Sequence, residues 1–124
     1  MNEATATILV VDDDEFTAEL TACILECAGY RTVIAEGGLD ALEKIEADPT
    51  VRMVVSDMYM PLIDGVQLCA ELREQGFQYP FVLLTGEDAA PLRLAHPELD
   101  AVLTKDGELQ ALLPETVATL LSGR

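Results

Sequence analysis

Residues 53–65 read MVVSDMYMPLIDG, and this stretch decides the fold. Its apolar start, Met53 to Val55, leads to the carboxylate of Asp57, a pattern typical of a short strand buried on both faces of a parallel sheet. The Met-Pro and Asp-Gly pairs that follow end the strand and turn the chain, because proline lacks a backbone donor and glycine tolerates a positive φ. The stretch therefore predicts an acid at the carboxyl end of a central strand, where open α/β sheets bind ligands.

The segment ILVVDDD at residues 8–14 repeats this design. An apolar strand again delivers carboxylates, here Asp12 and Asp13, to its carboxyl end, while Asp14 is placed to cap the helix that follows. If the two strands lie side by side in one sheet, their terminal acids meet. Two such strand ends predict a site for a hard cation.

Strand-like and helix-like segments alternate along the whole chain, which predicts a doubly wound, five-stranded parallel sheet flanked by about five helices. Pro91 and Pro97 tightly bracket the fourth helix, so we expect it to be short or distorted. Pro114 falls within the last helix and predicts a kink or two consecutive pieces. The predicted strands are 7–11, 30–35, 53–56, 81–84 and 101–103, and the helices are 16–28, 38–47, 64–75, 89–95 and 109–121.

Composition limits the classes of function. The chain has 124 residues, enough for one domain, which we expect to span residues 1–124 with its core at about 7–121. The net charge is −16, from 23 acidic and 7 basic residues, and this argues against direct binding of nucleic acid. We found neither an apolar run long enough to cross a membrane nor a secretory signal, and therefore expect a cytoplasmic protein.

The three cysteines, an odd number, fit a reducing compartment. Cys23 and Cys27 are one helical turn apart, and Cys69 lies on another predicted helix. We interpret all three as small buried apolar side chains rather than as redox or metal-binding groups.

Five side chains are predicted to converge at one edge of the sheet: Asp12, Asp13, Asp57, Thr85 and Lys105. Carboxylates held close together repel one another unless a cation lies between them, and oxygen ligands suit Mg²⁺, which also favours phosphate. A lysine ammonium and a threonine hydroxyl can each contact a further anionic oxygen. Together these groups predict a phosphoryl-accepting site with Asp57 as the nucleophile.

The motifs VVDDD (10–14), SDMYMPLIDG (56–65), LLTG (83–86) and LTK (103–105) resemble the receiver domain of two-component response regulators, a flavodoxin-like fold. Each motif is weak alone, but their order and their places at strand ends are specific. The resemblance implies that Asp57 accepts a phosphoryl group from a histidine kinase or a histidine phosphotransfer protein. It also implies that a downstream protein or output domain would read the phosphorylated state.

The resemblance also implies a role for each site residue. Asp13, Asp57 and the backbone carbonyl of Tyr59 bind Mg²⁺, and Asp12 acts through water. Lys105 pairs with the phosphoryl oxygens, and Thr85 moves to bond one of them, which is the switch. The chain would then act only on itself and would not be an enzyme with an external substrate.

Three departures from the family pattern lie close together. Asp106 replaces the proline that usually follows the lysine, so its carboxylate is placed to compete for the charge of Lys105. Val102 replaces an aromatic residue, and Thr85 and Lys105 are only 20 positions apart. These changes predict an atypical output face on the side of the fourth helix, fifth strand and fifth helix.

Two alternatives remain. A pseudo-receiver would keep the fold as a protein-binding module without phosphorylation, but Asp13, Asp57, Thr85 and Lys105 are all present. A Mg²⁺-dependent phosphatase with an aspartyl-phosphate intermediate would be a true enzyme, but residues 12–16, DDDEF, do not match its DxDx[TV] pattern.

Overall fold

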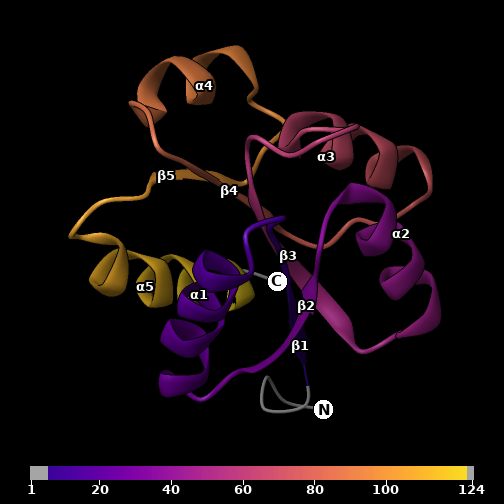
Figure 1. The fold of residues 1–124 in the computed structure, drawn as a ribbon, viewed down its shortest axis with the longest axis horizontal. Coiled ribbons are helices and arrows are strands. Elements are labelled where there is room, and N and C mark those ends of the chain that lie inside the picture. Colours follow the sequence, from indigo (N-terminus) through magenta and orange to yellow (C-terminus); the bar gives the residue numbers. More distant parts are fainter. Residues whose placement is uncertain (1–5, 123–124) are drawn as a thin grey trace.

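The computed structural model describes residues 6–122 and has the predicted alternation of five strands and five helices (Figure 1). The third strand begins at Val51, two residues before the predicted start. The strands are β1 (Thr7–Val11), β2 (Arg31–Ala35), β3 (Val51–Asp57), β4 (Phe81–Thr85) and β5 (Ala101–Thr104). The helices are α1 (Glu15–Cys27), α2 (Gly38–Ala47), α3 (Gly65–Glu74), α4 (Ala89–Ala95) and α5 (Leu109–Ser122).

The five strands form one parallel sheet in the order β2-β1-β3-β4-β5. The chain leaves β1 toward β2 on one side and then returns to β3 on the other side, so the order reverses between β1 and β3. In doubly wound sheets, ligands bind at the carboxyl ends of the strands beside such a reversal. The topology confirms the predicted fold class and places the end of β3 at this position.

Both faces of the sheet are covered, which explains the apolar runs in the sequence. Successive side chains of a strand point to opposite faces. One core cluster therefore contains Leu9, Val54 and Leu83 beneath α2 and α3, and the other contains Ile8 and Val55 beneath α1 and α5. Figure 1 shows these two helix pairs on opposite sides of the sheet.

The starts of α1 and α3 are capped by aspartate side chains. The Asp14 side chain accepts hydrogen bonds from the first turn of α1, as predicted. Asp64 and Gln67 form a reciprocal capping box at α3.

Helix α4 has seven residues, and the prediction of a short fourth helix is confirmed.

Helix α5 is a single helix with Pro114 inside it, so the alternative of two consecutive pieces is wrong. Proline removes one backbone donor, and the bonds on either side are enough to carry the helix through this position.

The interpretation of all three cysteines as buried side chains is wrong for two of them. Cys69 is buried, whereas Cys23 and Cys27 are exposed on α1. They line a groove of about 620 Å³ between α1 and the start of α5. The apolar pattern of the sequence suggested a buried face of α1 that includes both cysteines. In the structure that face is narrower, and its buried residues are Ala18, Thr21, Ala22 and Leu25.

Within residues 6–122, no helix combines the length and the apolar character that crossing a membrane requires.

Candidate functional site

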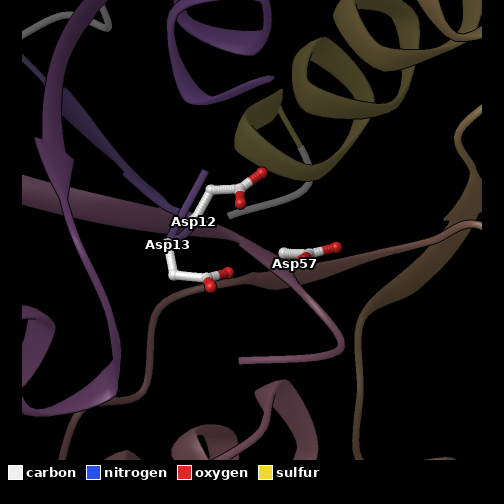
Figure 2. Close-up of side chains that lie close together, drawn as sticks. All are labelled: Asp12, Asp13 and Asp57. Carbon is white, nitrogen blue, oxygen red and sulfur yellow. The ribbon is translucent and has the colours of Figure 1, made fainter. Parts of the chain in front are cut away.

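Three aspartates meet at the carboxyl edge of the sheet. Val11 pairs with Ser56 in the β1–β3 register, so the residues that follow, Asp12 and Asp57, lie side by side. One carboxylate oxygen each from Asp12, Asp13 and Asp57 lies within 4.8 Å of the others. Figure 2 shows the three side chains pointing into the same space from the ends of β1 and β3.

The burial of the three acids differs. Asp12 is only 5% exposed, Asp57 is partly buried and Asp13 is exposed. An all-oxygen set of three carboxylates, open to solvent on one side, fits Mg²⁺, because this ion prefers oxygen ligands and keeps several of its waters. The donor chemistry present in the chain therefore suits the ion that the sequence predicted.

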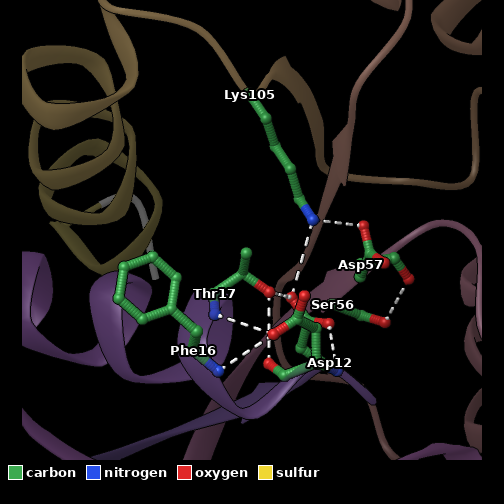
Figure 3. Close-up of polar contacts among 7 residues, drawn as sticks. Asp12, Phe16, Thr17, Ser56, Asp57 and Lys105 are labelled. Carbon is green, nitrogen blue, oxygen red and sulfur yellow. Dashed lines mark hydrogen bonds and ion pairs between the residues drawn. The ribbon is translucent and has the colours of Figure 1, made fainter.

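Lys105 reaches this cluster from the loop after β5 (Figure 3). Its Nζ lies 2.6 Å from Oδ1 of Asp57 and 3.5 Å from Oδ2 of Asp12. The backbone N–H of Lys105 donates to the carbonyl of Thr85 at 2.7 Å, which fixes the root of the side chain beside β4. The lysine thus points into the site, where its positive charge partly neutralises the negative charge of the acids.

Burial and pairing shift the pKa values of this ion pair. Burial raises the pKa of Asp57 above its usual value, and this outweighs the hydrogen bond and charge of Lys105, which lower it. Burial acts to lower the pKa of Lys105, but the hydrogen bond and charge of Asp57, together with the charge of Asp12, raise it overall. The ammonium is therefore firmly protonated.

Thr17 is a site residue that the sequence analysis missed. Its Oγ1 donates to Oδ2 of Asp12 at 2.7 Å (Figure 3). The backbone N–H of Asp14 donates to Oδ1 of Asp12 at 2.9 Å. The available signal was the position of Thr17 in the first turn of a helix that starts directly after the acids. A threonine there is ordinarily interpreted as a neutral helix residue, so the signal is weak.

Gly65 is the second residue that was missed as part of the site. A Cβ atom added to it would lie 2.7 Å from the carbonyl oxygen of Asp57 and 2.3 Å from Cδ1 of Leu83. Its N–H donates to the carbonyl of Met58 at 2.8 Å. The absence of a side chain lets the start of α3 pack directly against the backbone of the central acid.

Thr85 and Tyr59 lie beside the cluster. Thr85 is fully buried at the end of β4, and its Oγ1 accepts from the N–H of Glu87 at 3.1 Å. Tyr59 is 57% exposed, and its hydroxyl lies 3.4 Å from Oε1 of Glu87. The metal-binding role of the Tyr59 carbonyl stays a prediction.

Asp106 does not compete for Lys105 in the way that the sequence suggested. Its Oδ1 accepts from the N–H of Glu108 at 2.9 Å, at the start of α5. Among the described residues, the ion pairs of Lys105 are with Asp12 and Asp57. The backbone turn after the lysine therefore directs this carboxylate toward the helix.

Known proteins share this sequence pattern and fold. The family described as "Response regulator receiver domain" matches residues 8–116. The response regulator MprA of Mycobacterium ulcerans is 36% identical over 115 residues, which cover 91% of this chain and 49% of MprA. The alkaline phosphatase synthesis transcriptional regulatory protein PhoP of Bacillus subtilis is 38% identical over 81 residues, covering 65% and 33%. The chain thus spans half or less of the length of these relatives.

Solved structures agree. The crystal structure of response regulator protein TrrA from Thermotoga maritima, in complex with Mg²⁺-BeF, has a TM-score of 0.83 and 31% identity, and covers 94% of this chain and 99% of TrrA. A Francisella response regulator receiver domain has the same TM-score at 26% identity, covering 96% and 99%. With the acidic cluster and its lysine at the carboxyl edge of a five-stranded parallel sheet, these matches lead to one conclusion: the chain belongs to the receiver domain family of two-component response regulators.

Proposed function

We propose that Asp57 is the phosphoacceptor of this receiver domain. The observation that carries the proposal is its position. Asp57 ends the central strand, faces two further carboxylates and has the ammonium of Lys105 at 2.6 Å. A carboxylate oxygen of Asp57 would attack the phosphorus of a phosphohistidine on a histidine kinase or histidine phosphotransfer protein. The new O–P bond forms as the N–P bond breaks, and the imidazole nitrogen keeps the electron pair.

Asp13, Asp57 and the backbone carbonyl of Tyr59 would hold Mg²⁺, and Asp12 would act on it indirectly through water. Both Asp12 oxygens already accept protein hydrogen bonds, which supports this division of roles. When bound, the ion neutralises negative charge on the carboxylates and on the phosphoryl oxygens. TrrA, in complex with Mg²⁺-BeF, has the same fold, and this supports Mg²⁺ as the cofactor.

Lys105 and Thr85 would respond to the new phosphoryl group. In this structure Lys105 pairs with the carboxylate oxygen of Asp57, and after the transfer it would pair with a phosphoryl oxygen. The buried Thr85 hydroxyl lies on the neighbouring strand, where Leu84 is the register partner of Asp57. Its movement toward the phosphoryl group is the proposed conformational switch.

Acetyl phosphate with Mg²⁺ tests this function directly. Intact-mass spectrometry of the parent chain should show the addition of one phosphoryl group, which chelation of Mg²⁺ prevents and which Asp57→Ala abolishes. Asp48→Ala, which removes a partly exposed acid outside the site, is the matched control and should leave the modification unchanged. Phosphorylation of Asp57→Ala to the parent level would disprove the assignment.

The two alternatives predict other results. A pseudo-receiver would take up no phosphoryl group under these conditions. A phosphatase would release phosphate from an external ester with steady-state turnover, whereas we propose that this chain transfers and hydrolyses only the group on Asp57.

We also propose that the domain signals through an atypical face, or that it acts as a phosphate relay or sink. Val102 is buried in the core where the family usually has an aromatic residue, so no aromatic ring can rotate there. Helix α4 is short and is joined to β5 by a hydrogen bond from Arg93 to the carbonyl of Val102 at 2.9 Å. A map of NMR shifts upon phosphorylation that is confined to α4, β5 and α5 would contradict this proposal.

A further inference from the structure

The hydroxyl group of Thr17 connects α1 to the acidic cluster. Its Oγ1 lies 2.7 Å from Oδ2 of Asp12 and 3.2 Å from the backbone carbonyl of Asp14. A hydroxyl has one proton to donate, and a short bond to a charged acceptor is the stronger choice. The proton is therefore directed at Asp12, and the more distant carbonyl is at most a secondary partner.

The Asp12 carboxylate is enclosed by donors. It is 5% exposed, its Oδ1 accepts from the N–H of Asp14, and its Oδ2 lies near both Thr17 and the ammonium of Lys105. Two of these three donors come from the start of α1. The direction in which Asp12 presents its charge therefore depends on that helix.

The fold of α1 does not depend on the Thr17 hydroxyl. The backbone N–H of Thr17 is bonded to the side chain of Asp14, which also accepts from Phe16 and caps the helix. The Thr17 side chain is partly exposed at the end of the α1–α5 groove, so a valine of similar shape fits there. Removal of the hydroxyl should therefore affect the site and leave the helix in place.

We propose that Thr17 is a positioning residue that holds the Asp12 carboxylate toward Asp13 and Asp57 and thereby sets the affinity of the site for Mg²⁺. This inference rests on the proposed function. Without the hydroxyl, Oδ2 of Asp12 keeps only the ammonium of Lys105, which lies 3.5 Å away and pairs more closely with Asp57, so the carboxylate is held less firmly in its orientation toward the other acids. Groups that orient a metal-binding acid affect metal affinity although they do not contact the metal.

Titration of the unphosphorylated protein with Mg²⁺ alone, followed by calorimetry, tests this role. Thr17→Val should weaken Mg²⁺ binding by about tenfold, a typical effect of losing an orienting hydrogen bond. Thr17→Ser keeps the donor and should bind Mg²⁺ like the parent chain. Thr119→Val, an exposed site on α5, makes the same chemical change away from the cluster and should have no effect. Thermal unfolding without Mg²⁺ checks that all three variants are folded.

Phosphorylation by acetyl phosphate gives a second readout. The rate for Thr17→Val should fall at low Mg²⁺ and recover at saturating Mg²⁺, because Asp57 and Lys105 are unchanged. Parent-like or tighter Mg²⁺ binding by Thr17→Val, or equal weakening in Thr17→Ser, would overturn the inference while leaving the phosphoacceptor assignment intact. A parent chain that neither binds Mg²⁺ nor becomes phosphorylated would overturn the proposed function as well.

Discussion

Leu62, in the loop that follows β3, has a φ of 76° and is 85% exposed. A left-handed backbone is costly for a leucine, and its side chain is too exposed for packing to offset much of that cost. Leu62→Gly should therefore raise the free energy of unfolding by about 1 kcal/mol, since glycine adopts this conformation without a steric penalty. Urea denaturation followed by circular dichroism measures the change.

Leu94 provides the matched control, because it is 84% exposed but lies inside α4. Glycine there should lower the free energy of unfolding by up to about 1 kcal/mol, since it weakens the helix. If the two substitutions had the same sign, backbone strain at Leu62 would not be the cause.

At the scale of single residues, the sequence predicted the strand-end acids and Lys105 because each follows an apolar strand, and parallel strands deliver their ends to one edge. Thr17 could not be predicted in the same way. Its role depends on the angle at which α1 leaves Asp14, which only the folded chain defines. The exposure of Cys23 and Cys27 was missed for a related reason, because periodicity identifies a helix face but not how much of it is covered.

At the scale of the elements, helix α2 begins without a capping side chain, because its N-cap residue is Gly37. Other contacts stabilise its start. Oδ2 of Asp40, in the first turn, accepts from the backbone N–H of Glu36 at 3.0 Å, and Lys44 pairs with the same carboxylate at 2.9 Å. The hydrogen bond from Glu36, followed by the contact with Lys44, lowers the pKa of Asp40 below its usual value. The charged form therefore stabilises the folded state.

This shift predicts a pH dependence. A carboxyl whose pKa is lowered by folding contributes stability above its unfolded pKa of about 3.9 and loses it as the pH falls through the folded value. Asp40→Asn should therefore reduce the free energy of unfolding at pH 7 by about 0.5 kcal/mol, a size typical of exposed helix-end charges. The difference from the parent chain should shrink as the pH falls below about 4 and vanish below the folded pKa.

Urea denaturation of both proteins across this pH range measures the effect. Glu43→Gln removes one charge from an exposed position of the same helix and controls for net charge. A deficit of Asp40→Asn that persists unchanged under acidic conditions would contradict the argument.

The lengths of the elements were predictable where the sequence marks their ends. The short α4 was predicted correctly, because Pro97 follows its end and proline disfavours helical backbone before it. Pro91 lies inside the first turn of α4, where its missing donor is tolerated. Pro114 was a less reliable guide, since the rest of α5 can continue past one missing hydrogen bond. The start of β3 at Val51 was missed by two residues, because the charged Arg52 interrupts the apolar run.

At the scale of the whole molecule, the packing of the helices on the sheet leaves one thiol buried and two exposed. Cys69 lies on the buried face of α3, where burial raises its pKa, whereas Cys23 and Cys27 face the α1–α5 groove. Side-chain hydrogen bonding to Cys27 raises the pKa of Cys23, so its reaction should be slow at neutral pH but not blocked. Iodoacetamide should therefore modify two thiols in the folded protein and a third only in urea, as intact-mass spectrometry can count.

Cys69→Ser removes the buried thiol and is the control, since it should give two modifications with or without urea. Three modifications in the folded parent chain would mean that α3 opens far more easily than its packing suggests.

The direct packing of Gly65 on the backbone of Asp57 has a mechanical consequence. There is no intervening side chain to absorb a shift of that backbone, so movement of the acid must push α3 or break the Gly65–Met58 hydrogen bond. Helix α3 is thus joined to Asp57 by direct contact with its backbone. The backbone amide groups of α3 should therefore be among the first to change when Asp57 is chemically modified.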